Sequence, residues 1–68
     1  MKIKVKLSRI NETKEIQLEN GSTIENLLEK LNLKPDTLII LDKNVPIPVD
    51  SILNHNQEIT IVKVSSGG

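Results

Sequence analysis

The residues of this chain that could take part in chemistry are its last four, Ser65, Ser66, Gly67 and Gly68. Glycine has no Cβ, so the two glycines leave no side chain beside the carboxylate of Gly68. Such a tail can pass through a narrow slot and present its carboxylate to the active site of another protein. A carboxylate is a poor electrophile, but an acyl-adenylate formed with ATP would be open to attack by a thiol, a sulfide or an amine. Because Gly-Gly is also typical of a frayed end, the rest of the sequence must decide between these interpretations.

The sequence offers no other set of residues arranged for catalysis. It contains no cysteine and one histidine, His55, which lies among Asn54, Asn56 and Gln57 in an expected turn. These residues form neither a nucleophile–base pair nor a usual zinc site. The carboxylates are spread over different turns, and Gly21 is the only glycine outside the tail, so neither an acid–base pair nor a phosphate-binding loop is predicted. We therefore expect no catalytic residue, no metal site and no bound cofactor, and the chain would be a substrate rather than an enzyme.

Length and composition indicate one small domain. The chain has 68 residues, of which 37% are hydrophobic and none is aromatic, so the core must consist of Ile, Leu and Val, with little room for a cofactor pocket. Nine basic and nine acidic residues balance, and no aromatic side chain could stack on bases, which argues against nucleic acid as a direct partner. No apolar run approaches the ~20 residues of a membrane span, and no signal peptide is visible. We expect a cytoplasmic monomer without membrane contact.

Two alternating segments near the N-terminus predict an antiparallel hairpin. Residues 2–7 and 14–18 both alternate apolar and polar side chains, which is the period of a strand with one buried face. Residues 8–13 show little periodicity and would form the turn between them.

A short helix is predicted to follow the hairpin. Ser22 fits an N-cap, and Glu25 three residues later would complete a capping box. An apolar stripe at helical spacing comes next. It consists of Ile24, Leu27, Leu28 and Leu31. Asn32 and the Lys34-Pro35 pair are typical of the end of such a helix.

The second half of the chain predicts more strands. Residues 38–41 are a short apolar run bounded by turn residues. Pro46 and Pro48 restrict residues 45–49 to an edge strand or an extended loop, because proline cannot donate to the ladder. A helical turn, a polar turn and a last strand are expected over residues 50–53, 54–57 and 58–64.

This order of elements predicts an α+β fold in which one helix covers one face of the sheet. If Leu38 and Ile40 face the helix, the residues that alternate with them face outward. Four apolar side chains would then lie exposed beside the tail: Ile39, Leu41, Val62 and Val64. Such a patch is either an ordinary scatter of surface apolar residues or a protein-binding surface.

The order of elements and the tail resemble the β-grasp family of ubiquitin-like proteins. The resemblance is closest to the sulfur carriers of thiamine and molybdopterin type and to the small archaeal ubiquitin-like modifiers. It rests on MKIKV at residues 1–5, GSTI at 21–24, LDKNVPIP at 41–48 and ITIVKVSSGG at 59–68. Asn56-Gln57-Glu58 stands where the family often has a Gly-Asp turn, which leaves the tail unaffected. The resemblance implies a mixed sheet of four to five strands packed on one helix, with a β-grasp domain over residues 1–64 and a flexible tail over 65–68.

The resemblance also implies a function. A separate E1-like enzyme would adenylate the carboxylate of Gly68 with ATP and magnesium, while Ser65, Ser66 and Gly67 thread its slot. A sulfur donor protein would then supply sulfur to form a thiocarboxylate, for transfer reactions such as tRNA thiolation, or the carboxyl group would be joined to a lysine of a target protein. The exposed patch would dock the enzyme.

Two alternatives remain open. The first is a dedicated sulfur carrier for the synthesis of thiamine thiazole or molybdopterin. The second is of another class, a non-covalent β-grasp interaction module with an accidental Gly-Gly. Removing Gly68 distinguishes them, because a carrier would lose its activity and a binding module would still bind its partner.

Overall fold

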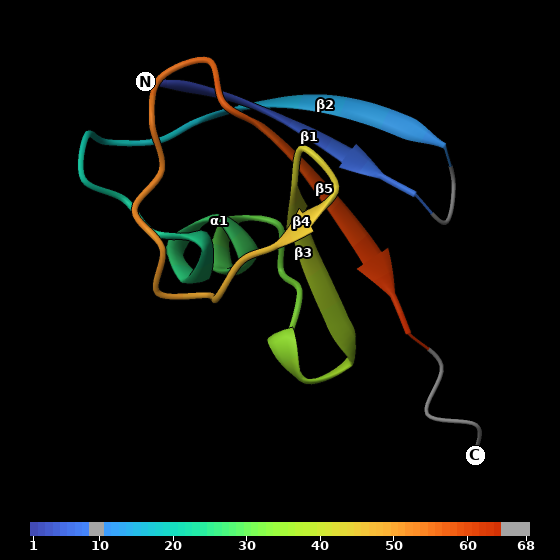
Figure 1. Cartoon of the computed structure of the whole chain (residues 1–68). Helices are drawn as coiled ribbons and strands as arrows, with labels where there is room; N and C mark the ends of the chain where they lie inside the picture. The colour runs from blue at the N-terminus through green and yellow to red at the C-terminus, as the bar shows by residue number, and fades with distance from the viewer. Residues whose placement is uncertain (9–10, 65–68) are drawn as a thin grey trace.

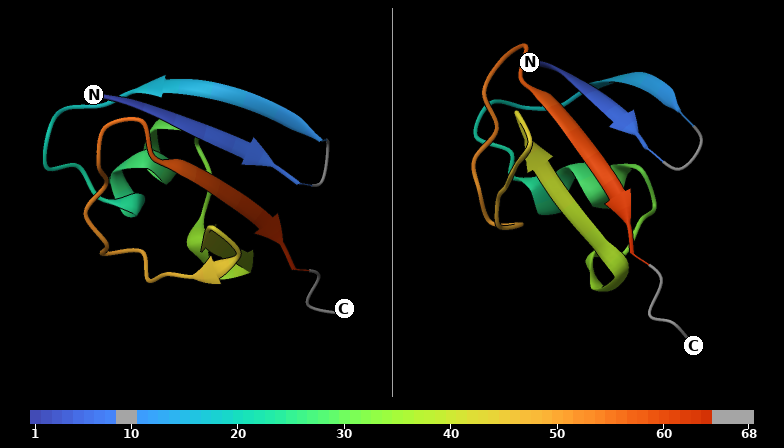
Figure 2. Two further views of the ribbon diagram at one scale, coloured as in Figure 1. Left: turned by 45° about the horizontal axis from the view of Figure 1, so that its top comes forward. Right: turned by 45° about the vertical axis from the view of Figure 1, so that its right-hand side comes forward.

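A five-stranded sheet and one helix form the two layers of the fold (Figure 1). The structure is a computed structural model, and it describes residues 1–8 and 11–64. The strand order across the sheet is β2-β1-β5-β3-β4, and α1 lies against one face (Figure 2). The pairing of β1 with β5 is parallel and the other pairings are antiparallel. This confirms the predicted α+β fold with a mixed sheet on one helix.

The predicted N-terminal hairpin is present. β1 (Lys2–Leu7) and β2 (Glu12–Gln17) pair antiparallel along their whole length. Ile3 and Val5 are fully buried, whereas the lysines that alternate with them are exposed. β2 begins two residues earlier than predicted, directly after Asn11, whose φ of 51° lies in the left-handed region used by turns.

The helix α1 (Ile24–Lys30) begins one residue later than its sequence indicated. Thr23 and not Ser22 is the N-cap, and Asn26 takes the place predicted for Glu25. The Thr23 N–H donates to Asn26 Oδ1 at 2.9 Å, and the Asn26 N–H donates to Thr23 Oγ1 at 3.4 Å. The capping box is therefore present, with both of its members shifted by one position.

The prediction of a helical turn at residues 50–53 is wrong. Two backbone hydrogen bonds explain this error and also the shifted N-cap of α1. The Leu53 N–H donates to the Ser22 carbonyl at 2.8 Å, and the Ile24 N–H donates to the Ser51 carbonyl at 3.1 Å. Because these backbone groups bond across to the segment before α1, they are not available for a helical turn. The same bonds hold Ser22 in an extended segment ahead of the helix.

The end of α1 agrees with the prediction. Asn32 has a φ of 59°, and the Leu33 N–H donates to the Leu28 carbonyl at 2.9 Å, which closes the helix. A short 3₁₀ helix, η1 (Pro35–Thr37), was not predicted and leads into the next strand.

The remaining strands close the sheet. β3 (Leu38–Asp42) and β4 (Val45–Pro46) form a tight hairpin. Its two turn residues, Lys43 and Asn44, have φ values of 52° and 67°. A two-residue hairpin turn of type I′ requires positive φ at both positions. β4 lies at the edge of the sheet, which is one of the two outcomes predicted for residues 45–49, but the strand ends at Pro46. β5 (Glu58–Lys63) lies between β1 and β3, in the middle of the sheet.

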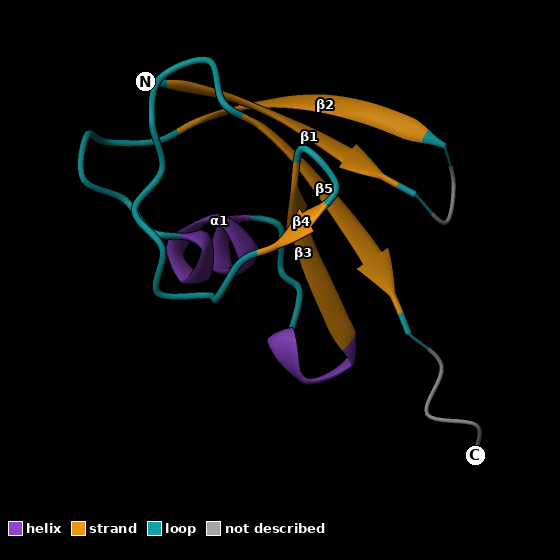
Figure 3. Ribbon diagram, in the orientation of Figure 1, coloured by secondary structure: helices purple, strands orange, loops and turns teal. Residues whose placement is uncertain are grey.

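The helix α1 lies against one face of the sheet (Figure 3). The core between these two layers is entirely aliphatic. Its buried members come from the helix, the three central strands and the loop before β5. They are Ile3, Val5, Ile24, Leu27, Leu28, Ile40, Leu53, Ile59 and Ile61. Among the residues that the structure describes, no helix has the length and apolar character needed to span a membrane.

Candidate functional site

β5 leads to the predicted reactive residues from the middle of the sheet. It pairs with β1 on one side and with β3 on the other. Ile59 and Ile61 on its inner face are 1% and 3% exposed. The Ser8 N–H also donates to the Ile61 carbonyl at 3.1 Å. Backbone pairing and side-chain burial therefore both fix the strand that precedes the tail.

Val64, the last residue that the structure describes, is still bonded to the sheet layer. Its N–H donates to the carbonyl of Thr37 at 2.8 Å, just before β3 begins. The bond places the base of the tail beside the start of β3. The residues predicted to thread and react, Ser65, Ser66, Gly67 and Gly68, lie outside the described part of the chain. The predicted boundary between domain and tail therefore stays a prediction.

The four residues of the predicted apolar patch lie on the sheet face turned away from α1. Ile39 in β3 pairs directly with Val62 in β5, and Leu41 follows on the same face of β3. Ile39 and Val64 are 40% and 38% exposed, and Leu41 and Val62 are partly buried. We call these four residues the outer apolar patch. The patch adjoins the point where the chain leaves β5.

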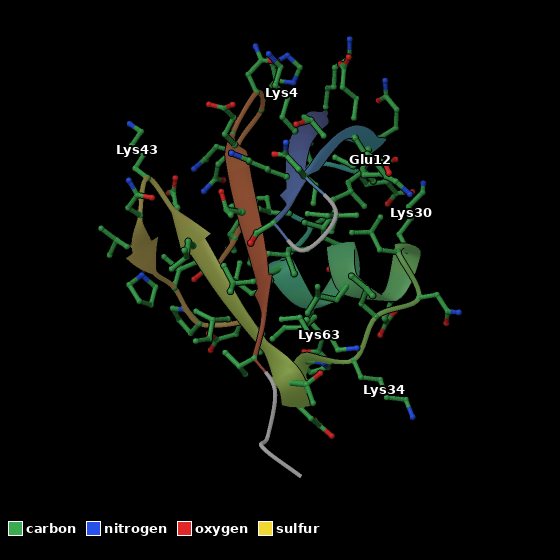
Figure 4. All side chains as sticks on the ribbon, turned by 90° about the vertical axis from the view of Figure 1, so that its right-hand side faces the viewer. Lys4, Glu12, Lys30, Lys34, Lys43 and Lys63 are labelled. Carbon is green, nitrogen blue, oxygen red and sulfur yellow. The ribbon has the colours of Figure 1, made fainter. Side chains whose placement is uncertain are left out.

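A group of lysines on the same face was not predicted from the sequence. Lys4 and Lys6 of β1 and Lys43 of the β3–β4 turn line one hollow of about 150 Å³, together with Glu58 and Thr60. We call these three lysines the lysine cluster; Figure 4 shows Lys4 and Lys43 at the same end of the molecule. The alternating lysines of β1 are visible in the sequence. The position of Lys43 depends on the pairing of β5 with both β1 and β3, which residue spacing does not reveal.

His55 has a structural contact. Its Nδ1 accepts a hydrogen bond from the Lys2 N–H at 3.2 Å, and the Asn56 N–H donates to the Lys2 carbonyl at 2.8 Å. The turn before β5 thereby fastens the start of β1. Within residues 1–8 and 11–64, no three His, Cys, Asp or Glu side chains lie close enough together to hold a metal ion.

Comparison with known proteins places this chain in a family. A family model described as small archaeal modifier protein 2 matches residues 1–65. A protein of Archaeoglobus fulgidus, described only as uncharacterized, is 36% identical over 69 residues, and the match covers both chains completely. The crystal structure of SAMP1 from Haloferax volcanii is similar with a TM-score of 0.77 and 15% identity, again over the whole of both chains. At this identity the structural match shows the β-grasp fold alone.

The family model therefore confirms the likeness to small archaeal ubiquitin-like modifiers that the sequence indicated, and the solved structure agrees with it in fold. The match to the family model includes every strand from β1 to β5 and ends at the first residue after Val64. The chain belongs to the family of small archaeal modifier protein 2.

Proposed function

We propose that this chain is the substrate of a separate E1-like adenylating enzyme and that the carboxylate of Gly68 is the group activated. The carboxylate attacks the α-phosphorus of magnesium-bound ATP, which releases pyrophosphate and forms an acyl-adenylate. A sulfide equivalent from a sulfur donor protein then displaces AMP and leaves a thiocarboxylate. Alternatively, the ε-amino group of a target lysine attacks the activated carboxyl carbon, displaces AMP and loses a proton, which leaves an isopeptide bond. In this scheme ATP and magnesium belong to the enzyme.

The observation that carries the proposal is family membership combined with the tail. Small ubiquitin-like modifiers are protein carriers rather than enzymes. The family match runs through residue 65, and Gly67 and Gly68 follow almost at once. A carrier of this class needs an unhindered terminal carboxylate, and glycine supplies one.

The anchoring of Val64 supports the same mechanism. The last hydrogen bond of the described chain, from Val64 to Thr37, lies four residues before Gly68. Four residues in an extended form span at most about 14 Å. That length would carry the Gly68 carboxylate into a slot while the folded domain stays at the entrance.

The outer apolar patch is the surface we propose for docking the enzyme. It includes Val64 and adjoins the base of the tail, so a partner that covers it would also receive the tail. An exposed apolar group of this kind on a small protein is typical of protein-binding surfaces. The sulfur acceptor beyond the thiocarboxylate, for which tRNA thiolation is our candidate, is part of the same proposal.

Intact mass measurement of the untagged protein from its native cell tests the proposal. The spectrum is recorded before and after treatment with a thiol alkylator, and the absence of cysteine removes any competing thiol. A species in which sulfur replaces one oxygen and which reacts with the alkylator indicates a thiocarboxylate on Gly68. Peptides of other proteins with the tail on a lysine indicate a modifier. A variant without Gly68 is the control, and it should give neither product.

The outcomes also distinguish the alternatives. A dedicated sulfur carrier for thiazole or molybdopterin synthesis would give the thiocarboxylate without lysine conjugates. If the full-length chain gives neither product under conditions in which other E1-like substrates react, the proposal fails and a non-covalent module is favoured.

A further inference from the structure

We propose that the lysine cluster and the outer apolar patch form one docking surface and that the lysines face an acidic surface of the adenylating enzyme. This inference rests on the proposed function and adds the charge and orientation of the partner. The lysines would steer the two proteins together, and the apolar patch would supply the contact beside the tail.

The outward side chains of β5 change from charged to apolar toward the tail. In order along the strand they are Glu58, Thr60 and Val62, and Val64 follows directly after its end. A strand rises about 3.3 Å per residue, so these positions span about 20 Å of the sheet face. The charged end and the apolar end are therefore two parts of one continuous surface.

The neighbouring strands extend each part. Lys4 lies opposite Glu58, and Lys6 is two residues further along the same face of β1. Lys43 completes the charged part from the β3–β4 turn. Ile39, which lies opposite Val62, extends the apolar part on β3. Because the charged part lies far from Val64, its lysines would contact the partner away from the slot that receives the tail.

The lysine cluster carries an excess of positive charge. Glu58 is the acidic residue that lines the hollow with the three lysines, which leaves a net charge of +2 there. Among the described residues, the ion pairs are Lys2–Glu15 at 3.4 Å and Lys14–Glu12 at 4.0 Å, and neither involves the cluster. The chain as a whole is neutral, so the excess on this face is balanced by negative charge elsewhere. Lys2 and Glu15, which form an ion pair on the same face of the sheet, add one charge of each sign, so the excess of +2 remains and an acidic surface would attract it.

A protein partner fits this surface better than a nucleic acid. Phosphate backbones attract lysines, but the adjoining apolar patch would gain nothing from a phosphate surface, and the chain has no aromatic side chain to stack on bases. A protein can match both parts, with acidic side chains at the rim and apolar ones at the centre. Rim charges act mainly by raising the association rate, and salt weakens them.

The test uses a charge-reversed variant and a matched control. Lys6→Glu combined with Lys43→Glu reverses two charges in the cluster. Lys14→Glu combined with Lys34→Glu changes the net charge equally but lies elsewhere, and Figure 4 shows Lys34 at the opposite end from Lys4 and Lys43. Circular dichroism checks that both variants fold. The probe is the E1-like enzyme purified from the same organism, assayed by pyrophosphate exchange at low and high ionic strength.

We expect the cluster variant to lose about tenfold in kcat/KM at low ionic strength, with kcat unchanged. The loss should shrink at high ionic strength, and the control should stay close to the unaltered chain. Equal kinetics for the two variants, or a loss that does not depend on salt, would overturn the inference. So would loss of tRNA binding by the cluster variant with unchanged adenylation. Pyrophosphate exchange with the unaltered chain tests the proposed function separately. A failure of this inference can therefore be distinguished from a failure of the proposed function.

Discussion

Replacing Val62 with aspartate should impair activation of the chain without unfolding it. Val62 is partly buried and packs beside Ile39 on the outer sheet face. Full burial of a valine stabilises by about 1.5–3 kcal/mol, so the loss at a partly buried position is about 1 kcal/mol. The poorer strand propensity of aspartate adds up to about 1 kcal/mol. A chain of this length is expected to have a free energy of unfolding of about 3–10 kcal/mol, so Val62→Asp should remain mostly folded.

The effect on docking should be larger. An aspartate in the middle of an apolar contact becomes a buried charge without a partner, and disruption of a central contact typically costs at least ~2 kcal/mol of binding free energy. That cost corresponds to a decrease of about 30-fold in kcat/KM. Pyrophosphate exchange catalysed by the E1-like enzyme, at varied concentrations of this chain, measures the parameter. A thermal melt of each variant measures the remaining folded fraction.

Ile52→Asp is the matched control. Ile52 is 65% exposed, and it bridges to the residue before α1, away from the outer apolar patch. We expect its kcat/KM to change by less than about threefold, because exposed sites outside an interface contribute little. Val62→Thr, which keeps the shape and the strand propensity, should lose less than Val62→Asp. If Val62→Asp and Ile52→Asp give the same kcat/KM with both proteins folded, the patch is not the docking surface.

Three further predictions concern the fold, and urea denaturation checks each. Thr23→Ala should lower the free energy of unfolding by about 0.5–1 kcal/mol, because the capping bond is long and exposed, whereas Ser22→Ala should cost less; the opposite order would contradict the assigned cap. Leu27→Ala should cost about 2–5 kcal/mol, because Leu27 is fully buried between helix and sheet, and a cost below that range would mean that the site collapses around the cavity. Asn44→Ala should cost about 1–2 kcal/mol because its φ is 67°, and Asn44→Gly should be tolerated; equal effects would exclude backbone strain as the cause.

Periodicity predicted the elements whose side chains alternate between core and solvent. Ile3 and Val5 repeat every second residue and Leu27 recurs at helical spacing, so local pattern alone places them in the core. The outer apolar patch followed from the same rule, because alternation in β3 requires Ile39 to face away when Ile40 is buried.

The predictions were wrong where two neighbouring residues suit the same role equally well and a contact with a distant segment selects one of them. Ser22 and Thr23 are both good caps, and each has a polar residue three positions later. The bond from Leu53 to the Ser22 carbonyl selects Thr23, and the same bond replaces the helical turn predicted for residues 50–53. The lysine cluster was not predicted for the same reason. Lys43 lies near Lys4 and Lys6 because β5 pairs with both β1 and β3, and local sequence does not reveal that pairing.

The central place of β5 has a consequence for biosynthesis. Residues 58–63 are made after all the other strands, yet β1 and β3 meet across the sheet only through them. A growing chain therefore exposes two unpaired strand edges until β5 emerges, and an interrupted product would keep them exposed. Such edges are templates for aggregation and are open to proteases. A chain that ends before β5 should thus fail to fold, so a product that stops short of the last strand is removed before it can compete with the complete carrier.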